Sequence, residues 1–142
     1  MASKILKIIV LSTLIDAALI GVGVKALNSY YNNSSIKSEK PMIQVTRRDT
    51  GILSYREYIK FTDGSEEVSD YPGIFSVSDK ITYYNSGKDS LVDKIKEEGW
   101  QYLSNTRFTK ILEREKDYAT NAEKFDKADR VLAEEKVSAN HE

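Results

Sequence analysis

The feature that most constrains this chain is a run of apolar residues near its amino terminus, from Ile5 to Leu27. Between Ile8 and Val24 the only charged residue is Asp16. A helix needs about 20 mostly apolar residues to cross a bilayer, with roughly 17 as the lower limit. The run therefore predicts a membrane anchor over residues 1–27.

Two other interpretations of this run stay open. Lys4 and Lys7 before the apolar centre, and the small-x-small sequence of residues 24–26, are the layout of a cleaved secretory signal. Signal cores usually run about 7–15 residues, and this one is longer. The third interpretation is a buried helix of a soluble domain. We expect an uncleaved transmembrane helix, because the run is longer than a signal core and a lysine at position 25 does not suit a cleavage site.

Asp16 is the costly residue of this span. A carboxylate near the centre of a transmembrane helix costs about 2.5–3.5 kcal/mol on insertion scales. Its side chain could face a partner in a helical bundle or handle protons. The simpler interpretation is that Asp16 is protonated and tolerated in a segment rich in Leu and Ile.

Basic residues beside a span set its orientation. The flanks are nearly balanced, with Lys4 and Lys7 before the span and Lys25, Lys37 and Lys40 after it. Because the chain begins like an export signal, we expect a single-pass membrane protein whose carboxyl-terminal domain lies outside the cytoplasm.

Composition excludes several classes of function. The 142 residues include 21 Lys and Arg and 22 Asp and Glu, for a formal net charge of −1. This balance gives no basic surface for nucleic acid, which needs a clustered positive face. The chain has no cysteine, which removes disulfides, thiol nucleophiles and thiolate metal sites.

The rest of the chain is long enough for one domain. Residues 28–41 are rich in Asn and Ser, lack an apolar period and end at Pro41, which predicts a flexible linker. An α+β domain is expected over residues 42–112, an amphipathic helix over 113–136 and a disordered tail over 137–142.

The clearest predicted structure is a β-hairpin in residues 52–68. Its first strand alternates, with Leu53, Tyr55, Ile59 and Phe61 on the expected core face and Ser54, Arg56, Tyr58 and Lys60 on the other. The dipeptide Asp63-Gly64 favours a two-residue type I′ turn, in which both central positions need positive φ. This turn sets Ile59 opposite Val68 and Lys60 opposite Glu67, which are favourable cross-strand pairs.

Two more short strands are expected over Ile74–Val77 and Lys80–Tyr84. The sequence Ser-Leu-Val-Asp at residues 90–93 is a capping-box pattern that predicts a short packed helix, with Gly99 at its end.

The segment after this helix has two interpretations. We expect a strand over Trp100–Ser104 that pairs with a strand over Arg107–Leu112 and sets Leu103 against Phe108. In the alternative, a long helix begins at about Thr106. Beyond residue 113, apolar residues recur at helical spacing.

The expected fold class is thus α+β. It comprises an N-terminal transmembrane helix, a linker, a small antiparallel β-sheet of hairpins with one short packed helix, and a C-terminal amphipathic helix.

No catalytic set, metal site or cofactor is predicted. The only histidine, His141, is second from the end, and a triad or a zinc site would need it held by folded neighbours. The acidic stretch from Asp63 to Glu67 lacks the alternating oxygen ligands of a calcium loop.

Tyrosine on the predicted strands is the one feature that suggests a binding surface. Strand propensity alone explains tyrosine at such positions. The functional hypothesis is an aromatic, hydrogen-bonding surface for a protein or glycan partner. Its expected residues are Arg56 and Tyr58, on the non-core face of the first hairpin, with Tyr83 and Tyr84.

These features lead to one main hypothesis, a membrane-tethered, non-enzymatic module that binds another macromolecule. One alternative is a small exported hydrolase that uses carboxylates alone. Another is an accessory subunit of a membrane complex, contacted through Asp16 and the last helix.

Overall fold

The computed structural model of the chain describes residues 39–73, 76, 78–101 and 103–141. The predicted anchor, Asp16 and most of the predicted linker lie outside the described residues. Within the described part of the chain, no helix is both long and apolar enough to cross a membrane.

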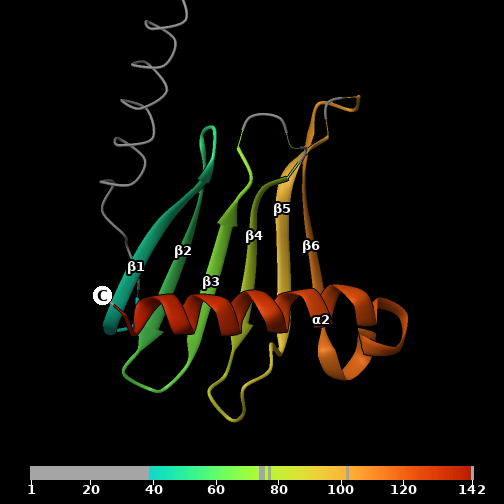
Figure 1. Ribbon diagram of the computed structural model, residues 1–142. Helices are drawn as coiled ribbons and strands as arrows, with labels where there is room; N and C mark the ends of the chain where they lie inside the picture. The colour runs from blue at the N-terminus through green and yellow to red at the C-terminus, as the bar shows by residue number, and fades with distance from the viewer. Residues whose placement is uncertain (1–38, 74–75, 77, 102, 142) are drawn as a thin grey trace, which may run out of the picture. The chain divides into compact units, whose positions relative to one another are not determined.

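Six strands form one antiparallel sheet in which neighbours along the chain are also neighbours in the sheet (Figure 1). They are β1 (Met42–Gly51), β2 (Ser54–Phe61), β3 (Glu66–Tyr71), β4 (Ser78–Asn85), β5 (Lys94–Gln101) and β6 (Thr106–Glu113). Helix α2 (Arg114–Ala139) follows β6 and runs back across one face of the sheet toward β1. The fold is therefore α+β, as predicted.

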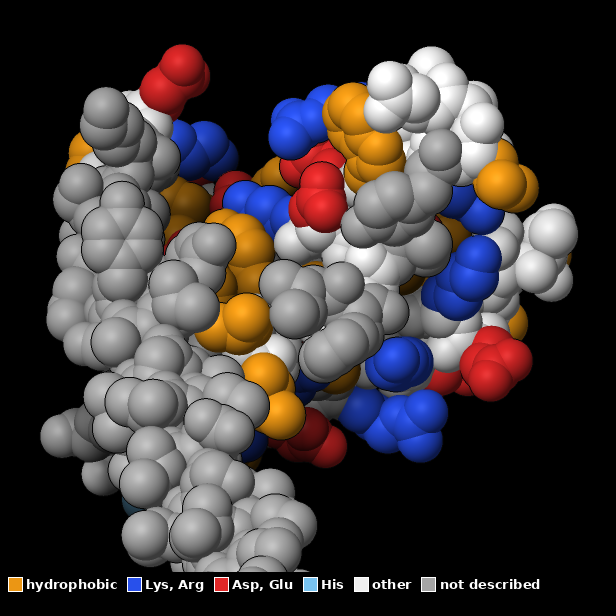
Figure 2. Space-filling model, turned by 90° about the horizontal axis from the view of Figure 1, so that it is seen from above, with side chains coloured by type: hydrophobic (Ala, Val, Ile, Leu, Met, Phe, Trp, Pro, Cys, Tyr) orange, Lys and Arg blue, Asp and Glu red, His pale blue; other side chains and the backbone are white. Residues whose placement is uncertain are grey.

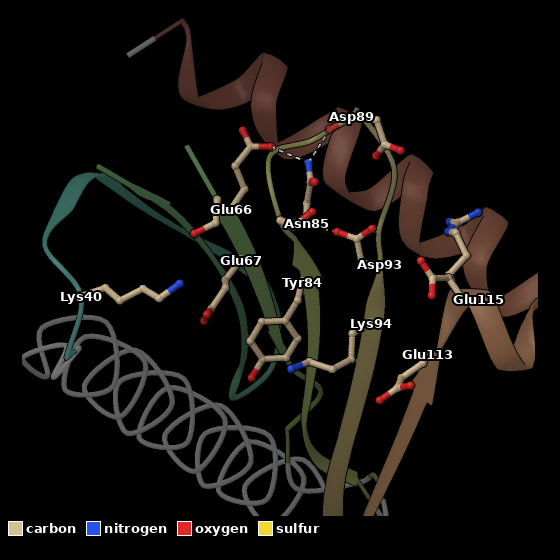
Figure 3. Close-up of a pocket in the computed structure, with 13 residues that line it drawn as sticks. Lys40, Glu66, Glu67, Tyr84, Asn85, Asp89, Asp93, Lys94, Glu113 and Glu115 are labelled. Carbon is tan, nitrogen blue, oxygen red and sulfur yellow. Dashed lines mark hydrogen bonds between the residues drawn. The ribbon is translucent and has the colours of Figure 1, made fainter. Parts of the chain in front are cut away.

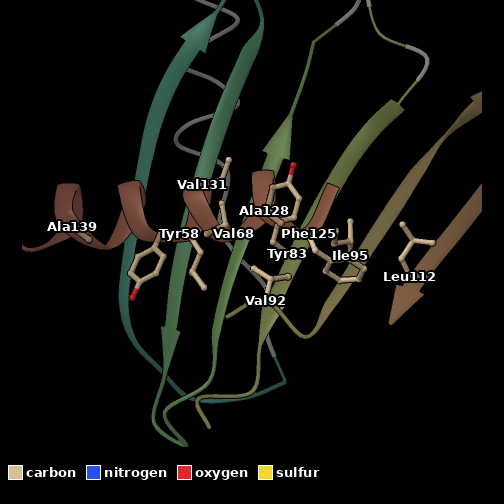
Figure 4. Packing of buried hydrophobic residues seen from close by; sticks show 11 residues of the cluster. Tyr58, Val68, Tyr83, Val92, Ile95, Leu112, Phe125, Ala128, Val131 and Ala139 are labelled. Atoms are coloured by element: carbon tan, nitrogen blue, oxygen red, sulfur yellow. The ribbon is translucent and has the colours of Figure 1, made fainter. Parts of the chain in front are cut away.

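The hydrophobic core lies between α2 and this face of the sheet (Figure 4). Cross-strand neighbours from β2 to β6 supply one row of it, consisting of Tyr58, Val68, Tyr83, Ile95 and Leu112. The helix supplies Phe125, Ala128, Val131, Leu132 and Ala139. Together with the buried Glu135, these positions follow the helical spacing of three or four residues, so a single side of α2 covers the row.

The C-terminal helix confirms the predicted helical pattern but extends to Ala139, beyond the expected end at Lys136. Ala139 is buried, and its carbonyl oxygen accepts a hydrogen bond of 2.7 Å from the Gln44 side chain. This contact with β1 orders three residues that composition assigned to a tail. Asn121 departs from helical geometry and kinks the helix near its start.

The β2–β3 hairpin turns where predicted, but with a different register. Gly64 has a φ of +84°, and its amide donates to the carbonyl oxygen of Phe61 at 3.1 Å. Asp63 does not share the positive φ, so the connection is a three-residue loop with a left-handed glycine instead of a type I′ turn. Tyr58, not Ile59, consequently lies opposite Val68.

This shift of one residue decides which face of β2 meets the helix. Val68 is fully buried in the core, so Tyr58 and Arg56 face α2, and the prediction that they lie on the non-core face is wrong. Ile59 and Phe61 point the other way and are nevertheless only 5% and 3% exposed. Alternation alone cannot orient a strand that is buried on both faces.

The predicted short packed helix is also wrong, because residues 94–101 form β5. Asp93, the expected acid of the capping box, is used in a turn instead, where its side chain accepts a hydrogen bond from the Ser86 amide at 2.6 Å. Next to the expected cap residue Ser90, the Asp89 side chain accepts a hydrogen bond from the Leu91 amide at 2.9 Å. Such local bonds offer the backbone an alternative to a helix. Strand β5 then pairs with both β4 and β6.

The strand Arg107–Leu112 is confirmed within β6, which excludes a helix that begins near Thr106. Leu103 lies in the β5–β6 turn, and Phe108 pairs with Gly99 instead of Leu103. The predicted strand Lys80–Tyr84 is confirmed within β4. Most of the predicted strand Ile74–Val77 lies outside the described residues.

Candidate functional site

A groove of about 560 Å3 lies at the end of the sheet that carries the β2–β3 and β4–β5 connections (Figure 3). Its volume is typical of ligand sites, which span about 300–1,000 Å3. Its charged lining consists of the acids Glu66, Glu67, Asp89, Asp93, Glu113 and Glu115 and the bases Lys40, Lys94 and Arg114. Acids thus outnumber bases along the groove.

Several of these charges hold the fold together. Glu66 is buried and receives hydrogen bonds from the Tyr58 hydroxyl at 2.7 Å and the Asn85 side chain at 3.0 Å, together with an ion pair from Lys136 at 2.5 Å. Burial raises the pKa of Glu66, but the Lys136 and Tyr58 hydrogen bonds outweigh it and hold the pKa below its ordinary value. Glu66 therefore fixes α2 to the sheet as a carboxylate.

Arg114 has a similar structural role at the start of α2. Its guanidinium donates to the carbonyl oxygen of Val92 at 2.6 Å and pairs with Asp129 at 2.6 Å. Asp129 also accepts a hydrogen bond of 2.9 Å from the Val92 amide. These contacts join the β4–β5 loop to the helix and close one wall of the groove.

Glu67 differs from these residues. Its carboxylate has no hydrogen bond or ion pair within the described part of the chain. Burial raises the pKa of Glu67 above its ordinary value, although the positive charges of Lys80, Lys40 and Lys94 partly oppose the change. A half-buried carboxylate that lacks a hydrogen-bond donor is stabilised when a ligand supplies that donor.

Tyr84 and Lys94 lie beside Glu67 on the face of the sheet that points away from α2. Glu67 pairs across the strands with Tyr84, and Tyr84 pairs with Lys94. The Lys94 ammonium stands 4.3 Å from the centre of the Tyr84 ring, which is a cation–π contact. We call Glu67, Tyr84 and Lys94 the groove triplet. It presents a carboxylate, an aromatic ring and an ammonium in one row.

The residues expected to bind a partner fall in two different places. Tyr84 lies in the groove, whereas Tyr58 and Tyr83 are 3% and 5% exposed in the core. Arg56 lies under α2, where it pairs with Asp70 at 3.1 Å and with Glu135 at 3.4 Å. Tyr84 is thus the one member of the predicted set that the structure places in the groove.

The sequence analysis did not single out Glu67 and Lys94. In the sequence they are two among many charged residues, and only the pairing of β3 with β4 and of β4 with β5 places them beside Tyr84. Within the described residues, no cluster of three or more His, Cys, Asp or Glu side chains could hold a metal ion.

Comparison of the chain with protein families, with curated proteins and with solved structures finds no match. The candidate site consequently stands on its geometry alone.

Proposed function

We propose that this protein is a membrane-tethered, non-enzymatic module that binds a segment of another protein in the groove at the end of its sheet. The observation that carries the proposal is the groove triplet. An unsatisfied carboxylate in a groove suits a basic side chain, which would pair with Glu67. The acidic excess of the lining favours the same kind of segment.

The predicted linker supports the tether. Lys40, which lines the groove, directly precedes Pro41 at the end of the linker. The linker, residues 28–41, spans at most about 50 Å when fully extended, at roughly 3.3–3.6 Å per residue. A partner bound in the groove would be held within that reach of the membrane surface.

One test places a photo-reactive phenylalanine at Tyr84 in the full chain and cross-links it in intact cells. We expect a cross-linked partner that is lost when the same chain also carries Glu67→Gln. The matched control places the photo-reactive residue at Tyr118, an exposed tyrosine of α2 that does not line the groove. Cross-linking that is unchanged by Glu67→Gln, or equal from Tyr118, would contradict the binding site.

The tether has its own test in cell fractionation. We expect the full chain in the membrane fraction, resistant to extraction at high salt. Recovery in the soluble fraction would contradict the tether but leave the groove untouched.

A hydrolase that uses carboxylates is the second candidate, and one pair of residues favours it. Glu57 lies diagonally from Glu67 on the same face of neighbouring strands, at a separation of about 7–8 Å between backbones. Glu57, however, is ion-paired with Arg47 at 2.6 Å and does not line the groove. The geometry supports binding better than catalysis.

A further inference from the structure

A second cavity, of about 170 Å3, lies between α2 and the face of the sheet that α2 covers. This face is opposite to the one that carries the groove triplet. Its floor is apolar and consists of Ile81 and Tyr83 from β4, Ile95 from β5 and Leu112 from β6. The remaining lining residues are Glu97, Lys110, Lys124 and Lys127. The cavity shares no residue with the groove of Figure 3.

The way α2 crosses the sheet explains the cavity. The helix crosses the sheet (Figure 1), and the cross-strand row of Tyr83, Ile95 and Leu112 belongs to the same buried cluster as its apolar residues (Figure 4). The next row on the same face, two residues farther along each strand, contains Ile81, Glu97 and Lys110. The helix runs across one half of the strands (Figure 1), so a wedge remains beside it over this second row.

The rim of the wedge is basic. Lys110 comes from β6, and Lys124 and Lys127 come from the same side of α2. None of these three lysines has an ion pair within the described part of the chain, although Glu123 precedes Lys127 at the favourable i, i+4 spacing. Figure 2 shows Lys and Arg side chains gathered on the side where β6 and the first turns of α2 lie.

The single acid of the lining does not neutralise this rim. Glu97 accepts a short hydrogen bond from the hydroxyl of Ser78 and faces Lys110 across the strands. Three ammonium groups against one carboxylate leave the rim with a net positive charge. An apolar floor under a cationic rim is complementary to a molecule with an apolar chain and an anionic head.

We propose that this wedge binds a medium-chain fatty acid, with its hydrocarbon chain on the floor and its carboxylate among Lys110, Lys124 and Lys127. The cavity has the volume of about six water molecules at roughly 30 Å3 each, and a methylene group is of similar size. A chain of about eight carbons therefore fits, with the last two at the rim. This site is independent of the groove and of the macromolecular partner proposed for it.

The test uses the full chain and octanoic acid that carries a photo-reactive diazirine at its tail. We expect cross-links to the strands that bear Ile81 and Ile95, located by peptide mass spectrometry. Ile81→Trp fills the wedge and should abolish these cross-links, with the thermal midpoint unchanged as evidence that the variant folds. Lys124→Gln with Lys127→Gln should weaken binding of octanoate about tenfold, because charge-assisted contacts are lost.

A matched pair, Lys88→Gln with Lys116→Gln, removes the same charge from lysines that do not line the wedge and should leave octanoate binding unchanged. The proposal is overturned if the control pair weakens binding as much as the rim pair. It is also overturned if Ile81→Trp leaves the labelling unchanged, or if the neutral octan-1-ol competes as well as octanoate.

Discussion

At the scale of single residues, the join between helix and sheet depends on ion pairs beneath α2. Glu135 is only 1% exposed and is bonded to Arg48 and Arg56. Arg56 also pairs with Asp70, yet its Nε finds no hydrogen-bond partner among the described residues. The loss of one further partner from this network should therefore destabilise the fold, because an unpaired buried charge has a high free-energy cost.

Glu135→Gln should lower the free energy of unfolding by about 3–5 kcal/mol, since it removes the buried carboxylate that Arg48 and Arg56 share and leaves Arg56 with Asp70 alone. Urea titration of the two chains measures this difference. The control is Glu134→Gln, a change to the exposed preceding residue, which should stay within about 0.5 kcal/mol of wild type. Equal effects of the two substitutions would contradict a structural role for the buried network.

The lowered pKa of Glu66 predicts a dependence of stability on pH. A carboxyl whose pKa is lower in the folded state stabilises the protein above its unfolded pKa of about 4.5. That contribution is lost as the pH falls through the folded pKa. Glu66→Gln should thus be destabilising at pH 7, and the difference from wild type should shrink below pH 4.5. A difference that is constant from pH 7 to pH 3 would contradict this linkage.

At the scale of elements, two turns at the same end of the sheet pack against each other. Gly64 in the β2–β3 turn and Gly87 in the β4–β5 turn both have φ near +80°. A Cβ on Gly64 would meet nothing within 4 Å, whereas a Cβ on Gly87 would stand 2.4 Å from the carbonyl oxygen of Gly64. Both glycines thus have a positive φ, but only at Gly87 would a side chain also collide with the backbone of the other turn.

Gly64→Ala should cost about 1–2 kcal/mol, which is the penalty for a left-handed backbone with a side chain. Gly87→Ala should cost more, because its methyl group also collides with backbone. Thermal unfolding of the two variants isolates the contact between the turns. If the two midpoints fall equally, the close approach of the turns contributes nothing to stability.

The turns also show why strand register was difficult to predict. Asp63-Gly64 correctly indicates a turn, but that dipeptide fits both a two-residue and a three-residue loop. Choosing between them moves every residue of β3 by one position relative to β2. The cross-strand charges were no guide, because Lys60 faces an acid in either register, Glu67 in the predicted one and Glu66 in the structure.

At the scale of the whole molecule, α2 completes a core that the sheet cannot close alone. Five of the eleven members of the buried cluster belong to the helix. Phe125 is fully buried and also lies under the guanidinium of Arg114. One face of a six-stranded sheet would be uncovered without this helix.

A chain that stops after Glu113 should therefore lose cooperative unfolding and bind a hydrophobic dye, since its core row would be exposed. Circular dichroism during a urea titration gives the readout. Removing only residues 140–142 is the control, because the helix ends at Ala139. A cooperative transition in the longer deletion would mean that the sheet folds without α2.

The sequence by itself determined the charge balance, the absence of cysteine, the order of several strands and turns, and the long final helix. These follow from composition and from contacts within a few residues. Only the tertiary structure decided that residues 94–101 form a strand, that Tyr58 and Arg56 face the helix, and that Glu67, Tyr84 and Lys94 share a row. Each of these depends on which strands pair and in what register, and a shift of one residue reverses the face of every side chain.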